Sequence, residues 1–199
     1  MRFGVVRFPG SCDEVDAVQA ARRVGDAELL WYADHDLRGV DAVIVPGGFS
    51  YGDYLRVGAI ARFAPVMAEV ERFARSGGPV LGICNGFQVL CEAGLLPGAL
   101  LPNTSLRFVC RQVDLVVEHA DTRFTNACTE GERLSIPAKH TTGCWYAPPD
   151  LRERVDGVLG VGHQADDVAR VVRDARDVAR RPVEAVARRI AQDHLALCL

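Results

Sequence analysis

The stretch Leu81-Gly82-Ile83-Cys84-Asn85-Gly86-Phe87-Gln88 decides how this sequence is interpreted. The short apolar run at 80–83 predicts a buried strand that leads directly into Cys84, and an apolar helix is predicted to follow it. A cysteine between two glycines, at the point where a strand becomes a helix, is typical of a nucleophile elbow with cysteine in place of serine. Glycines suit such a turn because it brings backbones close together and strains the residue at its apex.

The predicted elbow gives Cys84 the surroundings of a nucleophile. At a helix N-terminus, the macrodipole and the N–H groups of the first turn favour a thiolate over a thiol. The backbone N–H of Asn85 is then available to stabilise an oxyanion. The alternative is a core cysteine that happens to precede a glycine turn, since cysteine is commonly buried. The glycines on both sides of Cys84 favour the elbow.

A second glycine turn supports the same interpretation. The apolar run 41–45 stops at Pro46-Gly47-Gly48, and continuous apolar runs are typical of central strands in a parallel sheet. Because the carboxyl ends of parallel strands meet at one edge of the sheet, we expect this turn to lie beside the elbow. Gly48 is then predicted to present the second N–H of an oxyanion hole. An ordinary Gly-Gly turn explains this motif by itself, but not its combination with the elbow.

The remaining pattern predicts the fold class. Strands are expected at 2–8, 28–32, 41–45 and 80–83, with helices at 14–24 and 59–75. This alternation predicts an α/β protein with an open, doubly wound, mostly parallel sheet. After Asn103 the helices give way to strand-like stretches at 106–117 and 134–136. We therefore expect antiparallel strands added to the parallel sheet.

Composition excludes several classes of function. The chain has 199 residues and a formal net charge of −3, which gives no reason to expect a nucleic-acid partner or an anionic membrane. No apolar run approaches the roughly 20 residues that a membrane span needs. The seven cysteines are scattered, with no Cys-x-x-Cys pair, which argues against a disulfide framework or a metal site. We expect a cytoplasmic protein in a reducing compartment.

The two glycine motifs resemble the class I glutamine amidotransferase family. The stretch 82–88, together with Pro-Gly-Gly-Phe-Ser-Tyr-Gly-Asp-Tyr-Leu-Arg at 46–56, resembles more narrowly the glutaminase subunits of phosphoribosylformylglycinamidine synthase, in purine biosynthesis. Further matches occur at 8–11, 92–98, 103–110 and 136–140, so that the resemblance covers about residues 1–150. It implies a flavodoxin-like fold.

The resemblance also implies roles for individual residues. Cys84 would attack the side-chain amide of glutamine, giving a thioester and ammonia. Backbone N–H groups near Gly48 and at Asn85 would hold the oxyanion, and Gln88 would help to shape the glutamine pocket. The ammonia would pass to a large synthetase subunit, with a small third subunit bridging the two. ATP and magnesium would belong to that partner, so no cofactor or metal is expected in this chain.

The sequence departs from the family near its C-terminal end. The family supplies a base and its orienting carboxylate from a late His-Pro-Glu, which this sequence lacks; His194 stands at a comparable place but is followed by Leu195 and Ala196. We predict an amidotransferase domain at 1–154 and an atypical tail at 155–199, rich in Ala, Val and Arg, that is helical or poorly ordered. A native amphipathic helix and an out-of-frame segment both explain this tail.

Two functions follow from these observations. The first is a glutaminase that works through a Cys84 thioester. The second is a module of the same fold that lacks a complete triad and binds the synthetase without making ammonia, which leaves the catalytic competence of the chain open. On the sequence, no histidine is expected within hydrogen-bonding reach of the Cys84 sulfur with a carboxylate behind it. A cysteine hydrolase or a redox sensor explains the elbow but not residues 46–56.

Overall fold

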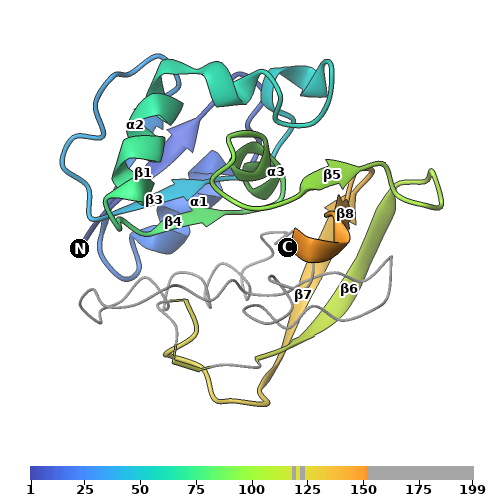
Figure 1. Ribbon diagram of the computed structural model, residues 1–199. Helices are drawn as coiled ribbons and strands as arrows, with labels where there is room; N and C mark the ends of the chain where they lie inside the picture. Colours follow the sequence, from blue (N-terminus) through green and yellow to red (C-terminus); the bar gives the residue numbers. More distant parts are fainter. Residues whose placement is uncertain (118–119, 122–123, 152–199) are drawn as a thin grey trace. The chain divides into compact units, whose positions relative to one another are not determined.

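The computed structural model describes residues 1–117, 120–121 and 124–151 (Figure 1). The chain divides after Leu96 into two compact units, Met1–Leu96 and Pro97–Leu199. The predicted boundary at 154 and the tail at 155–199 lie outside the described residues. Within those residues, no helix is both long enough and apolar enough to cross a membrane.

The first unit is built on a parallel sheet with the strand order β2-β1-β3-β4 (Figure 1). Its strands are β1 (Arg2–Arg7), β2 (Asp26–Trp31), β3 (Ala42–Val45) and β4 (Val80–Gly82). The chain passes from β1 to β2 on one side and then returns to place β3 on the other side of β1. The strand order therefore reverses between β1 and β3, and the carboxyl edge of the sheet at such a reversal is where open α/β sheets bind ligands. The predicted doubly wound fold is confirmed.

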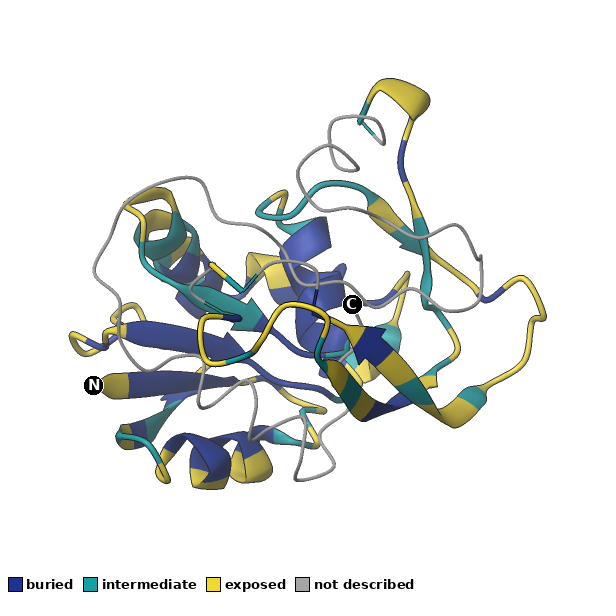
Figure 2. Cartoon of the chain, turned by 90° about the horizontal axis from the view of Figure 1, so that it is seen from below, coloured by how far each residue is buried: buried dark blue, intermediate teal, exposed yellow. Residues whose placement is uncertain are grey.

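Helices α1 (Glu14–Ala21), α2 (Pro65–Arg75) and α3 (Asn85–Glu92) cover the two faces of this sheet. Side chains alternate along a strand, so neighbouring residues of β1 and β3 point to opposite faces. On one face, Val6, Val43 and Val45 form a buried cluster with residues of α2 and α3. The fully buried Phe3, Val5 and Ile44 alternate with them and point to the other face, where α1 packs against β1 and β2. Apart from the ends of β1, both central strands are buried throughout (Figure 2).

The predicted helix at 59–75 is interrupted in the structure. A short 3-10 helix, η2 (Ala61–Phe63), is followed by Ala64 in an extended conformation, and α2 begins only at Pro65. A proline ring disfavours helical geometry at the residue before it but fits the first position of a helix well. The apolar spacing of 59–75 continues across the break, so periodicity alone did not reveal it.

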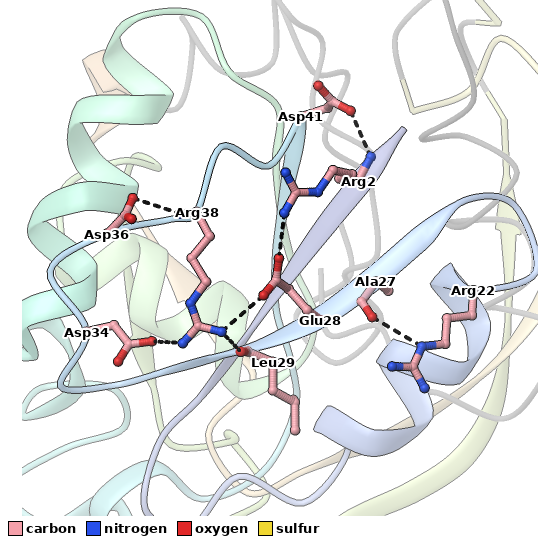
Figure 3. A network of polar contacts seen from close by, with 9 residues as sticks. All are labelled: Arg2, Arg22, Ala27, Glu28, Leu29, Asp34, Asp36, Arg38 and Asp41. Atoms are coloured by element: carbon pink, nitrogen blue, oxygen red, sulfur yellow. Dashed lines mark hydrogen bonds and ion pairs between the residues drawn. The ribbon is translucent and has the colours of Figure 1, made fainter.

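The outer edge of β2 is covered by two arginine side chains (Figure 3). Arg22 donates a hydrogen bond from Nε to the carbonyl oxygen of Ala27 at 3.1 Å, and Arg38 donates from Nη1 to that of Leu29 at 3.3 Å. The two carbonyls are two residues apart and therefore face the same way, towards the open side of the strand. Arg38 is held in place by Glu28 at 3.0 Å. Backbone acceptors at this edge are thus already bonded within the chain.

The described residues of the second unit form two small antiparallel sheets. Strand β5 (Ala99–Leu101) pairs with β8 (Cys144–Tyr146), and β6 (Val109–Val116) pairs with β7 (Arg133–His140). The antiparallel strands predicted after Asn103 are present, but among the described residues they pair with each other and not with the parallel sheet. The predicted strand at 134–136 extends through Pro137, which a two-stranded sheet tolerates because each of its strands has an open edge.

Asn103 organises the loops of the second unit. Its side-chain oxygen accepts from the Gly143 N–H at 2.9 Å, and its Nδ2 donates to the carbonyl oxygens of Arg107 and His140 at 2.8 and 2.9 Å. The same oxygen lies 2.8 Å from Nδ1 of His140. Because this oxygen can only accept, His140 carries a proton on Nδ1. His140 therefore has a structural role within this unit.

Candidate active site

Cys84 stands at the apex of a sharp turn between β4 and α3. Its backbone dihedrals are φ 50° and ψ −111°, and it is the residue that immediately precedes the first turn of the helix. The N–H of Ile83 bonds the Val45 carbonyl at 2.9 Å, so the turn starts directly from the sheet. The N–H of Gly86 then bonds the Ile83 carbonyl at 2.8 Å, which closes the turn. A positive φ at a non-glycine residue stores strain of the kind found at nucleophile elbows.

The two glycines around Cys84 lie where neighbouring backbone segments approach closely. A Cβ atom on Gly86 would be 1.8 Å from the carbonyl oxygen of Val45. A Cβ atom on Gly82 would be 2.9 Å from the backbone nitrogen of Phe87. Both positions therefore require glycine for steric reasons, and the Gly-x-Cys-x-Gly pattern follows from the tight packing of α3 against the ends of β3 and β4.

The turn at Gly47 and Gly48 lies beside the elbow. Val45 pairs with Gly82 in the sheet, which places Gly47 level with Cys84, and a Cβ atom on Gly47 would be 3.4 Å from that of Cys84. The Gly47 carbonyl accepts hydrogen bonds from the N–H groups of Cys12 and Asp13 at 3.1 and 3.3 Å. Because this peptide bond is trans, the Gly48 N–H points in the opposite direction, away from the segment after β1. That is the side of β3 on which β4 and the elbow lie.

The side chain of Asn85 connects the elbow to the loop at 50–53. Its Oδ1 accepts from the Ser50 N–H at 3.0 Å, and its Nδ2 donates to Oδ1 of Asp53 at 3.1 Å. The same nitrogen donates to Oε1 of Gln88 at 2.9 Å. Asn85 and Gln88 are both buried, at 3% and 5% relative exposure. The backbone N–H of Asn85 belongs to the first position of α3 and has no partner within the helix.

Two acidic residues lie near the elbow that sequence reasoning did not single out. Burial raises the pKa of the Asp53 carboxyl above its ordinary value, and the hydrogen bond from Asn85 offsets part of this rise. The Asp13 carboxylate lies over the Gly47 turn, because a Cβ atom there would be 2.3 Å from its Oδ2. Burial and the neighbouring Asp13 charge raise the pKa of Cys12. The position of Asp13 in the segment between the first strand and the first helix, at the edge where ligands bind, was the available signal.

The histidines do not complete a triad within the described residues of the first unit. His35 is exposed, and His140 belongs to the Asn103 network of the second unit. His163 and His194 lie outside the described residues, so the assignment of a base remains a prediction. No group of three side chains suited to a metal ion occurs in the part of the chain that the structure describes. No disulfide joins the six cysteines found there.

Known proteins resemble this chain in both sequence and fold. The family model of the CobB/CobQ-like glutamine amidotransferase domain matches residues 1–156. The PurQ subunit of phosphoribosylformylglycinamidine synthase from Rubrobacter xylanophilus is 56% identical over 187 residues, covering 89% of this chain and 85% of that protein. The PurQ subunit from Mycolicibacterium paratuberculosis is 59% identical over 157 residues, covering 78% of this chain and 70% of that protein.

Among solved structures, a chain of PurLQS from Thermotoga maritima superposes with a TM-score of 0.71 at 44% sequence identity. The match covers 75% of this chain and 70% of that one. The family match spans both glycine motifs and the whole parallel sheet. The chain therefore belongs to the family of CobB/CobQ-like glutamine amidotransferase domains.

Proposed function

We propose that this chain is the glutaminase subunit of a phosphoribosylformylglycinamidine synthase and releases ammonia from glutamine for purine biosynthesis. The observation that carries the proposal is the elbow, in which Cys84 has a φ of 50° and lies level with Gly47 in the turn after β3. Relatives that are 56% and 59% identical carry the name of this subunit, which supports the choice of substrate. A thiol nucleophile of a biosynthetic enzyme also suits a reducing cytoplasm.

In the proposed reaction, the Cys84 sulfur attacks the side-chain amide carbon of glutamine. The tetrahedral oxyanion is held by the N–H groups of Gly48 and Asn85, which approach from two different strand ends. The carbon–nitrogen bond then breaks, the nitrogen takes up the proton that the Cys84 thiol gave up and leaves as ammonia, and a thioester remains. Water hydrolyses the thioester to glutamate and returns the thiol. Gln88, on the helix that follows Cys84, helps to bind the glutamine.

The ammonia needs an acceptor. The solved complex from Thermotoga maritima carries the name PurLQS, which supports a large synthetase subunit as the partner of this chain and a small third subunit in the same assembly. We assign ATP and magnesium to the synthetase and none to this chain.

Ammonia release from glutamine tests this proposal. The full chain is assayed alone and with a purified synthetase subunit, and the thioester is trapped by rapid acid quench and mass spectrometry. Cys84→Ala is expected to abolish both ammonia and thioester, whereas Cys12→Ala should retain both. If Cys84→Ala released ammonia at the wild-type rate, the nucleophile would be another residue. A wild-type chain that binds the synthetase but forms no thioester would instead be the non-catalytic module that the missing His-Pro-Glu suggests.

A further inference from the structure

The orientation of the Asn85 side chain is fixed by its neighbours. An amide group has an accepting end and a donating end, and each must meet a complementary partner when it is buried. The backbone N–H of Ser50 can only donate, and it faces Oδ1 of Asn85 at 3.0 Å. Oδ1 of Asp53 accepts a hydrogen bond from Nδ2 of Asn85 at 3.1 Å. Turning the amide over would place two donors together at one end and two acceptors at the other.

The fixed orientation of Asn85 determines that of Gln88. The Nδ2 of Asn85 also donates to Oε1 of Gln88 at 2.9 Å, so the end of Gln88 that turns away from Asn85 is its amide nitrogen, with two N–H bonds. Gln88 follows Cys84 by four residues, which places both on the same side of the start of α3. N–H donors on that side match the carbonyl and carboxylate oxygens of glutamine.

The loop that holds Asn85 is itself firmly anchored. Arg56 forms two hydrogen bonds with Glu92 of α3, at 2.6 and 2.7 Å. Between Ser50 and Arg56 the backbone has positive φ at Tyr51, Asp53 and Leu55. Strain of this kind persists only where the surrounding contacts maintain it. Asp is one of the few residues that tolerate a positive φ, so its presence at position 53 suits both the backbone and the hydrogen bond.

We propose that the side chain of Asn85, held between the Ser50 N–H and the Asp53 carboxylate, is a positioning residue that sets which end of the Gln88 amide faces the bound glutamine. This role rests on the proposed glutaminase function. It differs from the oxyanion contact of Asn85, which uses the backbone N–H. It also gives the loop at 50–56 a part in substrate selection, because the loop sets the orientation of an amide on the helix after the nucleophile.

A pair of variants separates orientation from simple attachment of the loop. In Asp53→Asn, the introduced amide oxygen still accepts from Asn85 and the residue still tolerates a positive φ, so Gln88 keeps its orientation. In the double variant Asp53→Asn with Asn85→Asp, the carboxylate introduced at position 85 accepts from the Ser50 N–H and from the amide introduced at position 53. The loop therefore stays attached, and the net charge equals that of the wild type. That carboxylate, however, can only accept, and Gln88 must turn its nitrogen towards it.

Glutamine affinity is measured as the protection of Cys84 from iodoacetamide over a range of glutamine concentrations, with each variant compared with its own unprotected rate. The rate of Cys84 alkylation without glutamine reports how moving the charge from position 53 to position 85 affects the thiol. The glutamine concentration that halves this rate reports glutamine binding. Urea unfolding of each variant reports whether the loop is attached. Asp53→Asn is expected to bind glutamine within about threefold of the wild type, and the double variant about tenfold or more weakly. Both variants should unfold cooperatively, the double variant at lower urea, because it returns a carboxylate to the buried position 85.

The remaining outcomes contradict the proposal, and each does so for a different reason. If the double variant binds glutamine as well as Asp53→Asn, the orientation of Gln88 does not matter and Asn85 only attaches the loop. If the double variant fails to fold, Asp53→Asn still decides: a tenfold loss of affinity in that variant would mean that the charge of Asp53, not the orientation of Asn85, supports binding. If glutamine does not protect the wild-type chain, the glutaminase function itself fails, and the role of Asn85 falls with it.

Discussion

The carbonyl oxygen of Val45 occupies the space that a side chain on Gly86 would need, since a Cβ atom there would lie only 1.8 Å from it. Gly86→Ala must therefore push α3 away from the end of β3. We expect a loss of about 3 kcal/mol in the free energy of unfolding, the upper part of the range for overpacked sites. Urea unfolding measures this loss. Gly94→Ala is the control, because nothing lies within 4 Å of its Cβ position and only its φ of 68° is unfavourable. A Gly86→Ala protein as stable as Gly94→Ala would contradict the packing of the elbow.

Cys84 stores backbone strain that a glycine would relieve. At φ 50° and ψ −111°, a residue with a Cβ atom is disfavoured. Both Cys84→Ala and Cys84→Gly should lose ammonia release, but Cys84→Gly is expected to be more stable than Cys84→Ala by about 1–2 kcal/mol. Thermal or urea unfolding of the two variants measures the difference. If Cys84→Ala were instead the more stable variant, as alanine usually is relative to glycine, the turn would not be strained.

Gly48→Ala tests the proposed second oxyanion donor. A Cβ atom there would lie 2.6 Å from the Cys12 nitrogen and 2.7 Å from the Gly10 carbonyl oxygen, so the turn has to shift. We expect kcat for ammonia release to fall about 100-fold, as when one oxyanion donor is lost, with a much smaller change in KM for glutamine. Steady-state kinetics separate the two constants. An unchanged kcat in a folded variant would remove Gly48 from the site.

Asp53 makes stability depend on pH. Its pKa is raised by burial, so the folded chain holds this proton more tightly than the unfolded chain. The free-energy cost of burying the Asp53 carboxylate is therefore absent below its ordinary pKa of 3.8, where the group is protonated in both states. This cost increases as the pH rises through the folded-state pKa. Asp53→Asn should raise the free energy of unfolding at pH 7, and this gain should disappear at acidic pH. Urea unfolding across pH measures it, with the exposed Asp114→Asn as control; a gain independent of pH would contradict the assignment.

Cys91 should resist alkylation in the folded chain. Burial, together with the charge of Glu92, raises its pKa to about 12. At pH 8 roughly one molecule in 10,000 then carries the thiolate at this position, which is the form that reacts. Peptide mapping after brief treatment with iodoacetamide is expected to find Cys84 modified and Cys91 intact. Added glutamine should slow the modification of Cys84. Early modification of Cys91 would mean that α3 opens readily.

The local sequence carried enough information to predict the sheet and the elbow. Continuous apolar runs that end at glycines mark buried strands, and the elbow glycines are required by contacts between adjacent segments. The break at Ala64 was hidden because the apolar spacing runs through it, although Pro65 was a visible signal. The pairing of the antiparallel strands was not predictable, because strand patterns show burial but not the partner.

The contact between Asn85 and Asp53 was also beyond sequence reasoning. The two residues are 32 positions apart, and their hydrogen bond depends on a loop with several positive φ angles at residues other than glycine. Propensities describe such conformations poorly, because the loop is maintained by the helix it touches. Asn85 was singled out for its backbone N–H, whereas its side chain makes three of the bonds that shape the site.

The hydrogen bonds that turn the Gly48 N–H towards the elbow come from the segment after β1, the donor itself follows β3, and the nucleophile follows β4. The proposed catalysis therefore depends on three strands meeting in one register, and a slip of one residue between β3 and β4 would move Gly47 away from Cys84. A chain that is still being synthesised, or has partly unfolded, would have its thiol but no oxyanion hole. In the proposed mechanism, glutamine is therefore not hydrolysed until the whole parallel sheet is assembled.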